Sequence, residues 1–227
     1  MTYAEKILKY YDELKLPDNL PEGVEILYPF AEEEVQRVTR LFYNQFFNDS
    51  NKRAFLIGIN PGRFGGGATG IPFTDPIRLE EVLSIENDFD KKSELSSRFI
   101  YQMIEAVGGS ELFYKHFYFT SVSPLGFVKD GKNLNYYDIP ELQRAIEPYM
   151  VSEIRKQIAF GAHPTAFSLG KGKNISYLKY LNKKYELFEQ IVPLPHPRWV
   201  MQYRLKRLDE FIDQYVQAFA PIINEAN

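Results

Sequence analysis

Short apolar runs alternate with longer amphipathic stretches along most of this chain, and that alternation constrains its fold most strongly. A run such as RAFLIGI at 53–59 is typical of a strand that is buried on both faces of a sheet. Strands that alternate with helices form a parallel sheet covered by helices on both sides. We therefore predict an α/β fold, a single three-layer domain with a central, mostly parallel four-stranded sheet flanked by helices. The predicted strands are residues 53–59, 117–120, 157–161 and 187–192.

Helical patterns separate these strands and extend the chain at both ends. Residues 3–15 and 31–47 read as amphipathic helices, so residues 1–50 are expected to form a helical extension packed on a single domain, 1–227. Asp75-Pro76 is a good helix start, because proline is tolerated in the first turn. Further helices are predicted at 96–107, 140–156 and 164–182, and a last one in the tail from Met201.

The composition excludes several kinds of functional site. Cysteine is absent, which removes disulfides, zinc–thiolate sites, iron–sulfur clusters and thiol nucleophiles. The three histidines, His116, His163 and His196, do not have the spacing of metal ligands. We therefore expect no metal site.

No targeting or membrane segment is recognisable. The first residues carry charges throughout and lack the apolar core of a secretory signal. No stretch approaches the roughly 18 apolar residues that span a membrane. We expect a cytoplasmic monomer that does not associate with membranes.

Positive charge gathers in the last third of the chain, although the net charge is −3. Residues 163–185 contain five lysines and no acid, and residues 190–208 also contain no acid. Either run alone is equally well explained by a solvated face, but together they indicate a local phosphate-binding face. The basic residues of the second run are Arg198, Arg204, Lys206 and Arg207.

A glycine-rich loop follows the first strand, at the end where parallel sheets bind ligands. Residues 65–70 match the dinucleotide fingerprint Gly-x-Gly-x-x-Gly, with Asp88 or Asp90 near the distance expected for a ribose contact. The match begins six residues after the strand, however, and Pro72 and Pro76 interrupt the segment that should continue as a helix. No Gly-Lys-Ser/Thr is present, which excludes a Walker-type phosphate loop.

The same loop resembles the first motif of the uracil-DNA glycosylases, specifically the single-strand-selective monofunctional (SMUG) type. The chain reads GINPGRFG at 58–65 and TGIPF at 69–73, where that type has GMNPGPFG and TGVPF. The two segments keep the same order and nearly the same gap. The order of elements extends the resemblance over about residues 50–220 and leaves the first fifty residues uncovered.

The second family motif, His-Pro-Ser-Pro-Arg, follows the last strand. This chain has LPHPR at 194–198. Aligning the His-Pro pair gives His196 the catalytic position with a two-residue deletion, whereas a gap-free alignment gives that position to Leu194. We prefer His196, because a histidine beside the strand end has a chemical role and leucine has none. The alternative is a loop histidine without a role.

Two positions depart from the family pattern. Ser121 stands where this type has an asparagine that reads the edge of uracil, and a hydroxyl offers less than an amide that both donates and accepts. Gly62 stands where stringent members carry a tyrosine that blocks 5-methyl groups. The resemblance therefore implies a broader range of bases than uracil alone.

The resemblance implies a monofunctional DNA glycosylase of base excision repair, whose partner is DNA containing uracil or related damaged bases. Such an enzyme flips the base out and hydrolyses its N-glycosidic bond. Asn60 would orient the attacking water, His196 would donate to the leaving base, and Phe73 would stack on it. The implied substrate-binding residues are Gly58, Ile59, Pro61, Gly62, Phe64, Phe73 and Ser121, and the implied DNA-binding residues are Arg198, Trp199, Arg204, Lys206 and Arg207.

Other interpretations stay open at this point. The chain is alternatively a catalytically silent DNA-binding module of the same fold, or a nucleotide-binding α/β enzyme that uses the glycine loop. Trp199, the only tryptophan, either wedges into DNA beside Arg198 or lies in the core and anchors the last helix.

Overall fold

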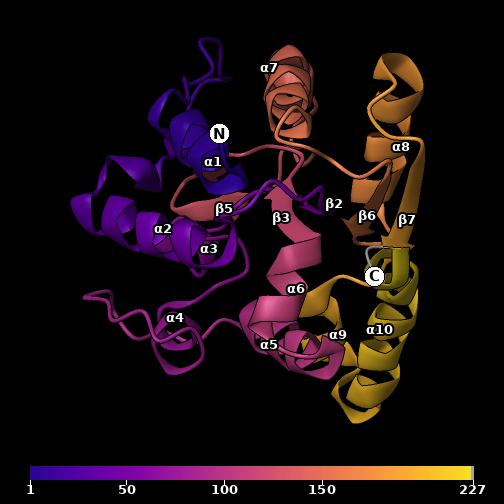
Figure 1. The fold of residues 1–227 in the computed structure, drawn as a ribbon. Helices are drawn as coiled ribbons and strands as arrows, with labels where there is room; N and C mark the ends of the chain where they lie inside the picture. The colour runs from indigo at the N-terminus through magenta and orange to yellow at the C-terminus, as the bar shows by residue number, and fades with distance from the viewer. Residues whose placement is uncertain (226–227) are drawn as a thin grey trace.

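The computed structural model describes residues 1–225, and its centre is a sheet of four parallel strands. Helices cover both faces of this sheet (Figure 1), which confirms the predicted α/β class and four-stranded sheet. The strands lie in the order β3-β2-β6-β7, and their bounds in that order are Phe117–Ser121, Ala54–Gly58, Thr165–Leu169 and Gln190–Leu194.

A second, antiparallel sheet and the helices complete the described part of the chain. The second sheet has the order β1-β4-β5, with bounds Glu25–Leu27, Gly126–Lys129 and Lys132–Leu134. The α-helices are α1 (Tyr3–Asp12), α2 (Glu33–Phe46), α3 (Gly66–Thr69), α4 (Pro76–Glu81), α5 (Leu95–Val107), α6 (Ser110–His116), α7 (Pro140–Ile158), α8 (Lys173–Tyr185), α9 (Pro197–Tyr203) and α10 (Leu208–Glu225), and the 3₁₀ turns are η1 (Pro29–Ala31) and η2 (Leu205–Arg207). Within the described residues, no helix has the length and apolar character needed to cross a membrane.

Side chains along β3 alternate between the two faces of the sheet, so this apolar strand is buried on both sides. Phe117 and Phe119 contact Phe113 of α6 on one face. Tyr118 points to the other face and contacts Tyr3 of α1. The N-terminal helix therefore shares one hydrophobic core with the sheet.

The predicted strand at 157–161 is wrong. These residues form the end of α7 and the turn after it, and strand β6 lies inside the predicted helix 164–182. A short apolar run does not distinguish a buried helix end from a strand. Gln157, in the last turn of α7, attaches this helix end to the sheet, because its side-chain oxygen accepts a hydrogen bond of 2.6 Å from Thr120. Gly161, with φ of 122°, then turns the chain toward β6.

The tail and the last strand also differ in their bounds from the prediction. Strand β7, Gln190–Leu194, begins three residues later and ends two residues later than expected. The tail from Met201 is not one helix: it contains the end of α9, the turn η2 and then α10.

The hairpin β4–β5 packs against the loop that follows β2. A Cβ atom on Gly126 would lie only 2.3 Å from the carbonyl oxygen of Pro61, so only glycine permits this approach. The hairpin turns at Asp130-Gly131, whose φ angles of 51° and 68° are both positive, as a two-residue type I′ turn requires. This hairpin brings β5 to the carboxyl end of the parallel sheet.

The glycine-rich loop folds back on itself and does not open into a phosphate-binding helix. Its fingerprint segment forms the single turn α3. A Cβ atom on Gly67 would lie 1.8 Å from the carbonyl oxygen of Gly62, and one on Gly70 would lie 2.6 Å from Val35 on α2. The glycines at 67 and 70 therefore serve close packing inside the loop and against α2.

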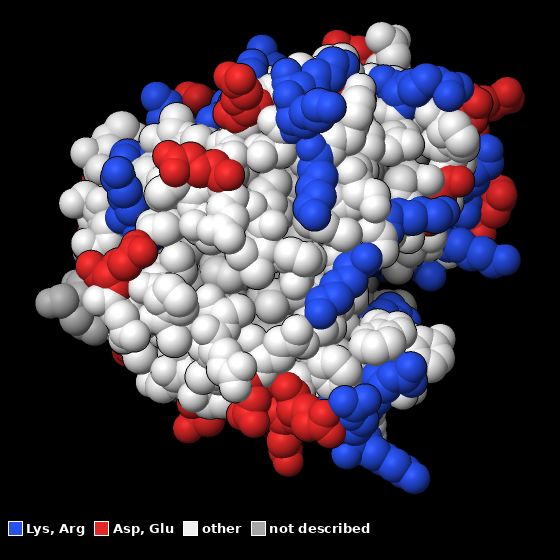
Figure 2. All heavy atoms as spheres, turned by 90° about the vertical axis from the view of Figure 1, so that its right-hand side faces the viewer, with Lys and Arg blue, Asp and Glu red and all other residues white. Residues whose placement is uncertain are grey.

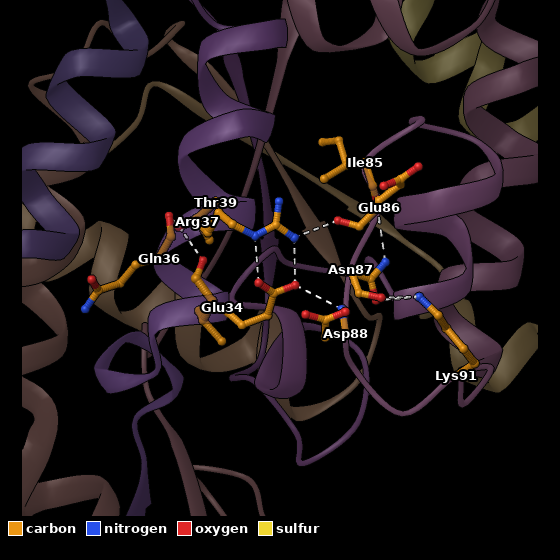
Figure 3. A network of polar contacts seen from close by, with 10 residues as sticks. Glu34, Gln36, Arg37, Thr39, Ile85, Glu86, Asn87, Asp88 and Lys91 are labelled. Atoms are coloured by element: carbon orange, nitrogen blue, oxygen red, sulfur yellow. Dashed lines mark hydrogen bonds and ion pairs between the residues drawn. The ribbon is translucent and has the colours of Figure 1, made fainter.

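A polar network ties the segment after α4 to α2 (Figure 3). Arg37 forms two hydrogen bonds of 2.7 Å with the carboxylate of Glu34 and donates to the carbonyl oxygen of Glu86. Glu34 also accepts a hydrogen bond of 3.0 Å from the backbone N–H of Asp88. The backbone at Asp88 is thereby held at α2.

Candidate active site

The loops after β2, β3 and β7 enclose a cavity of about 470 Å³ at the carboxyl end of the sheet. Its size lies within the range of about 300–1,000 Å³ that small-molecule sites usually have. The predicted residues that line it are Gly58, Ile59, Asn60, Pro61, Gly62, Phe64, Phe73, Ser121, His196, Arg198 and Trp199. Three predicted DNA-binding residues do not line it, namely Arg204, Lys206 and Arg207.

Asn60 follows β2 and is locked by backbone groups. Its side-chain Nδ2 donates to the carbonyl oxygens of Pro61 (3.2 Å) and Leu134 (3.0 Å). Its Oδ1 accepts a hydrogen bond of 2.9 Å from the N–H of Tyr136. Both amide hydrogens are thus used, and one lone pair on Oδ1 is left to accept a hydrogen bond. Asn60 can therefore orient a water molecule that donates to Oδ1.

Hydrogen bonds around Tyr136 extend this lock to the strand end. The hydroxyl of Tyr136, which is fully buried, donates to Oδ1 of Asn174 at 2.9 Å. Asn174 in turn donates to the carbonyl oxygens of Ile57 and Gly58 at 3.5 and 3.4 Å. The segment after β5, the N-terminal turn of α8 and the end of β2 therefore hold the amide of Asn60 in one place.

His196 caps helix α9 with its imidazole ring. Its Nδ1 accepts a hydrogen bond of 3.2 Å from the backbone N–H of Arg198, so Nδ1 carries no proton. Burial and then the charge of Arg198 lower the pKa of His196 from 6.5 to about 4. The ring is consequently neutral near pH 7, and Nε2 is the nitrogen that carries the proton. His196 thus offers one neutral N–H donor to the cavity.

The loop that presents His196 is anchored by the last helix. Tyr215 of α10 donates a hydrogen bond to the carbonyl oxygen of Pro195. Leu194 is the last residue of β7 and is only 2% exposed, and it does not line the cavity. The structure therefore places the histidine of the preferred alignment, and not Leu194, at the cavity.

The low pKa of His196 predicts how pH affects any reaction that uses its neutral N–H. Because the pKa is about 4, the ring stays neutral, and we expect the rate of such a reaction to be constant between about pH 5.5 and 8. The shift also links folding to pH, since the unfolded state binds the proton with the ordinary pKa near 6.5. Thermal stability should therefore decrease as the pH falls from about 6.5 toward 4. A rate that halves near pH 6.5 would show instead that the ring titrates normally.

Phe73 reaches the strand end through an unusual backbone conformation. Its φ is 57°, a region that residues with side chains seldom adopt. A Cβ atom on Gly58 would lie 3.0 Å from Cζ of Phe73, so the absence of a side chain there lets the ring lie over β2. Phe119 contacts the ring at a centroid distance of 5.2 Å. This strained backbone conformation places an aromatic surface beside Gly58.

Ser121 is the last residue of β3, and its hydroxyl oxygen can accept a hydrogen bond from a group in the cavity. Its hydroxyl donates a hydrogen bond of 2.6 Å to the carbonyl oxygen of Ser123. The single proton of the hydroxyl is therefore used, whereas its lone pairs stay available. An asparagine at this position would present a donor as well, so the serine differs from it in a definite way.

Several residues that line the cavity were not predicted from the sequence. Glu94 is the only carboxylate among the described residues that line it, and its oxygens accept from Ser96 and Ser97 at 3.0 and 2.9 Å. These bonds make Glu94 the N-terminal cap of α5. The other residues that line the cavity and were not predicted are Tyr11, Pro29, Phe30, Gly66, Gly70, Pro72, Ser96, Thr120, Pro124, Asn133, Leu134, Asn135, Gln202 and Tyr203.

Trp199 and Tyr203 form one rim of the cavity on α9. Trp199 is 40% exposed and Tyr203 is 65% exposed, so neither belongs to the core. One edge of Trp199 still meets Phe211 of α10, and the guanidinium of Arg204 lies 4.8 Å from the ring centroid. Trp199 therefore both supports α10 and presents a surface to solvent.

The described residues contain no cluster of three or more His, Asp or Glu side chains that could hold a metal ion. What faces the cavity is an amide with a free acceptor, a neutral imidazole N–H and an aromatic ring. A family model described as the uracil DNA glycosylase superfamily matches residues 45–220. The chain belongs to the uracil DNA glycosylase superfamily.

A solved structure gives the same result for the whole chain. The crystal structure of wild-type SMUG2 from Pedobacter heparinus matches this glycosylase with a TM-score of 0.95 and 41% sequence identity. The match covers 99% of each chain, so it includes helix α1 and most of α2, which precede the part matched by the family model. The resemblance to SMUG-type glycosylases is confirmed, and with it a monofunctional uracil-DNA glycosylase of base excision repair.

Proposed function

We propose that this glycosylase releases uracil and related damaged bases from DNA with Asn60 and His196 as its catalytic residues, acting as a monomer without metal or cofactor. The observation that carries the proposal is the meeting of these two side chains at one cavity, from the ends of β2 and β7. The free lone pair of Asn60 can accept a hydrogen bond from water, and the free N–H of His196 can donate one to the departing base.

Hydrolysis of the N-glycosidic bond needs help at both ends of the bond. The transition state is oxocarbenium-like at the sugar, and the departing base becomes anionic. A water that donates to Oδ1 of Asn60 keeps its oxygen lone pair free to attack C1′. Nε2–H of His196 donates to the base oxygen O2 as negative charge develops there, which is how an oxyanion hole acts. Phe73 stacks on the flipped base.

Ser121 offers the edge of the base a different set of hydrogen-bonding groups from those that an asparagine at this position would offer. Because the proton of Ser121 is donated to Ser123, its oxygen can accept from an N–H of the base such as N3–H of uracil. Gly62 leaves the 5-side of the base without a blocking side chain. Together these two residues allow a wider range of bases than uracil.

Closing the space at Gly62 should narrow this range. We expect Gly62→Tyr to abolish release of 5-hydroxymethyluracil while uracil release falls by a smaller factor, because the new side chain would have to displace the amide of Asn133 and would fill the cavity wall at this position. The measurement is the ratio of single-turnover rates on the two bases, with Gly62→Ala as the control of small volume. A wild-type enzyme that refuses 5-hydroxymethyluracil would refute the open-pocket interpretation.

The face beside the cavity fits a DNA backbone. Figure 2 shows Lys and Arg side chains from the top of this face to its lower right, beside an indentation of the surface. Arg198 and Trp199 follow His196 directly and line the cavity, where they can occupy the space that a flipped nucleotide leaves. Arg204 and Lys206 are exposed and can contact flanking phosphates. Arg207 is already paired with Glu210 at 2.7 Å and so contributes less to phosphate binding.

A nucleotide-binding enzyme does not fit the structure, since the glycine fingerprint is a packed turn and neither Asp88 nor Asp90 lines the cavity. A catalytically silent module would share this fold and is distinguished by activity. We expect abasic sites in a uracil-containing oligonucleotide from a panel of single lesions, developed with alkali, and an unchanged rate in EDTA. No abasic site from any lesion, or complete inhibition by EDTA, would refute the proposed function.

A further inference from the structure

Asn133 is a polar side chain of the cavity wall that the proposed mechanism does not use. It lies on β5, one residue before Leu134, whose carbonyl oxygen holds Asn60. It faces Gly62 directly, because a Cβ atom on Gly62 would lie 3.2 Å from Nδ2 of Asn133. The amide of Asn133 therefore borders the space beside Gly62 that a side chain at residue 62 would enter.

The orientation of the Asn133 amide is set by one hydrogen bond. Its Oδ1 accepts from the backbone N–H of Arg63 at 3.2 Å. Its Nδ2 has no hydrogen-bond partner among residues 1–225. The amide thus turns its acceptor to the loop and its two N–H donors to the side of Gly62.

We propose that Asn133 is a specificity-determining residue, which donates a hydrogen bond to an acceptor on the 5-side of the flipped base. This inference rests on the proposed function, since it assumes that the base enters the cavity beside Gly62. A 5-formyl oxygen would satisfy the free N–H donors of Asn133. Asn133 is exposed, so water satisfies these donors in the free enzyme. A 5-substituent without an acceptor would displace that water and leave the donors unsatisfied, which is unfavourable. Gly62 leaves room for the 5-substituent, and Asn133 favours a 5-substituent that accepts a hydrogen bond.

The chain offers a matched variant that separates this role from a structural one. Asn133→Asp retains an oxygen that accepts from the N–H of Arg63, but it replaces the free donor with a second acceptor. Asn133→Ala removes the donor without adding charge. Lys132→Ala is the control, because Lys132 is exposed on the same strand and does not line the cavity.

The readout is the ratio of single-turnover rates on 5-formyluracil and uracil, in otherwise identical single-stranded oligonucleotides. We expect both Asn133 variants to lower this ratio by about tenfold, the effect of one lost hydrogen bond, and Lys132→Ala to leave it unchanged. A ratio that stays constant in both variants while uracil is still released would overturn the role of Asn133 alone. A wild-type enzyme that releases neither base would instead overturn the proposed function.

Discussion

Replacing His196 with alanine is expected to lower the single-turnover rate of uracil release by about 10²- to 10³-fold, the usual effect of a lost oxyanion-type donor. The reason is that Nε2–H of His196 is the neutral donor placed at the cavity, and the low pKa keeps it neutral. The rate should be measured with enzyme in excess over a uracil-containing single strand, so that product release does not limit it. DNA affinity should change little.

The histidine also caps α9, so its removal has a structural effect that needs a control. Loss of the bond from Arg198 N–H to Nδ1 should destabilise the fold by about 1 kcal/mol, as for other N-caps. His196→Asn keeps a good N-cap and therefore separates folding from chemistry: its melting temperature should stay near that of the wild type while its rate falls. A near-normal rate for His196→Ala would remove the catalytic role from His196.

Replacing Asn60 with alanine should lower the same rate by about 10²-fold or more, because the attacking water loses the acceptor that orients it. The structure adds an effect on folding. The amide makes three hydrogen bonds to backbone groups, to Pro61, Leu134 and Tyr136, so the variant should also lose about 1–3 kcal/mol of stability. Thermal unfolding measures this loss.

Asn60→Asp is the matched variant for this position. It retains an oxygen that accepts from Tyr136 N–H and from water, but it loses both Nδ2 donations. We expect Asn60→Asp to keep more activity than Asn60→Ala at equal fractions of folded protein. Equal rates for the two variants would mean that the oxygen of residue 60 does not orient the water.

The sequence predicts the loops that line the cavity well because each of them is a local pattern. Asn60 and His196 each lie two residues beyond a strand end, so the parallel sheet brings them together wherever the helices pack. The strand at 157–161 was wrong for a physical reason: its apolar residues bury one face of a helix end, and a run of five residues carries no period that would show it.

A local pattern in the sequence indicates the turn of the hairpin β4–β5. Asp130-Gly131, flanked by Phe127 and Val128, is a typical type I′ hairpin turn. Recognising it would have predicted β5, but not that Asn133 faces Gly62 or that Leu134 holds Asn60. Those contacts join segments more than 70 residues apart and depend on the tertiary packing at Gly126.

The identity of the released product tests the central claim most directly. Wild-type enzyme should be incubated with a single-stranded oligonucleotide that contains one uracil, and the small products separated by chromatography. Hydrolysis by Asn60 and His196 predicts free uracil in amounts equal to the abasic sites, with a strand that breaks only after alkali. No free uracil at enzyme excess, or a strand that is cut without alkali, would contradict a monofunctional glycosylase built on these two residues.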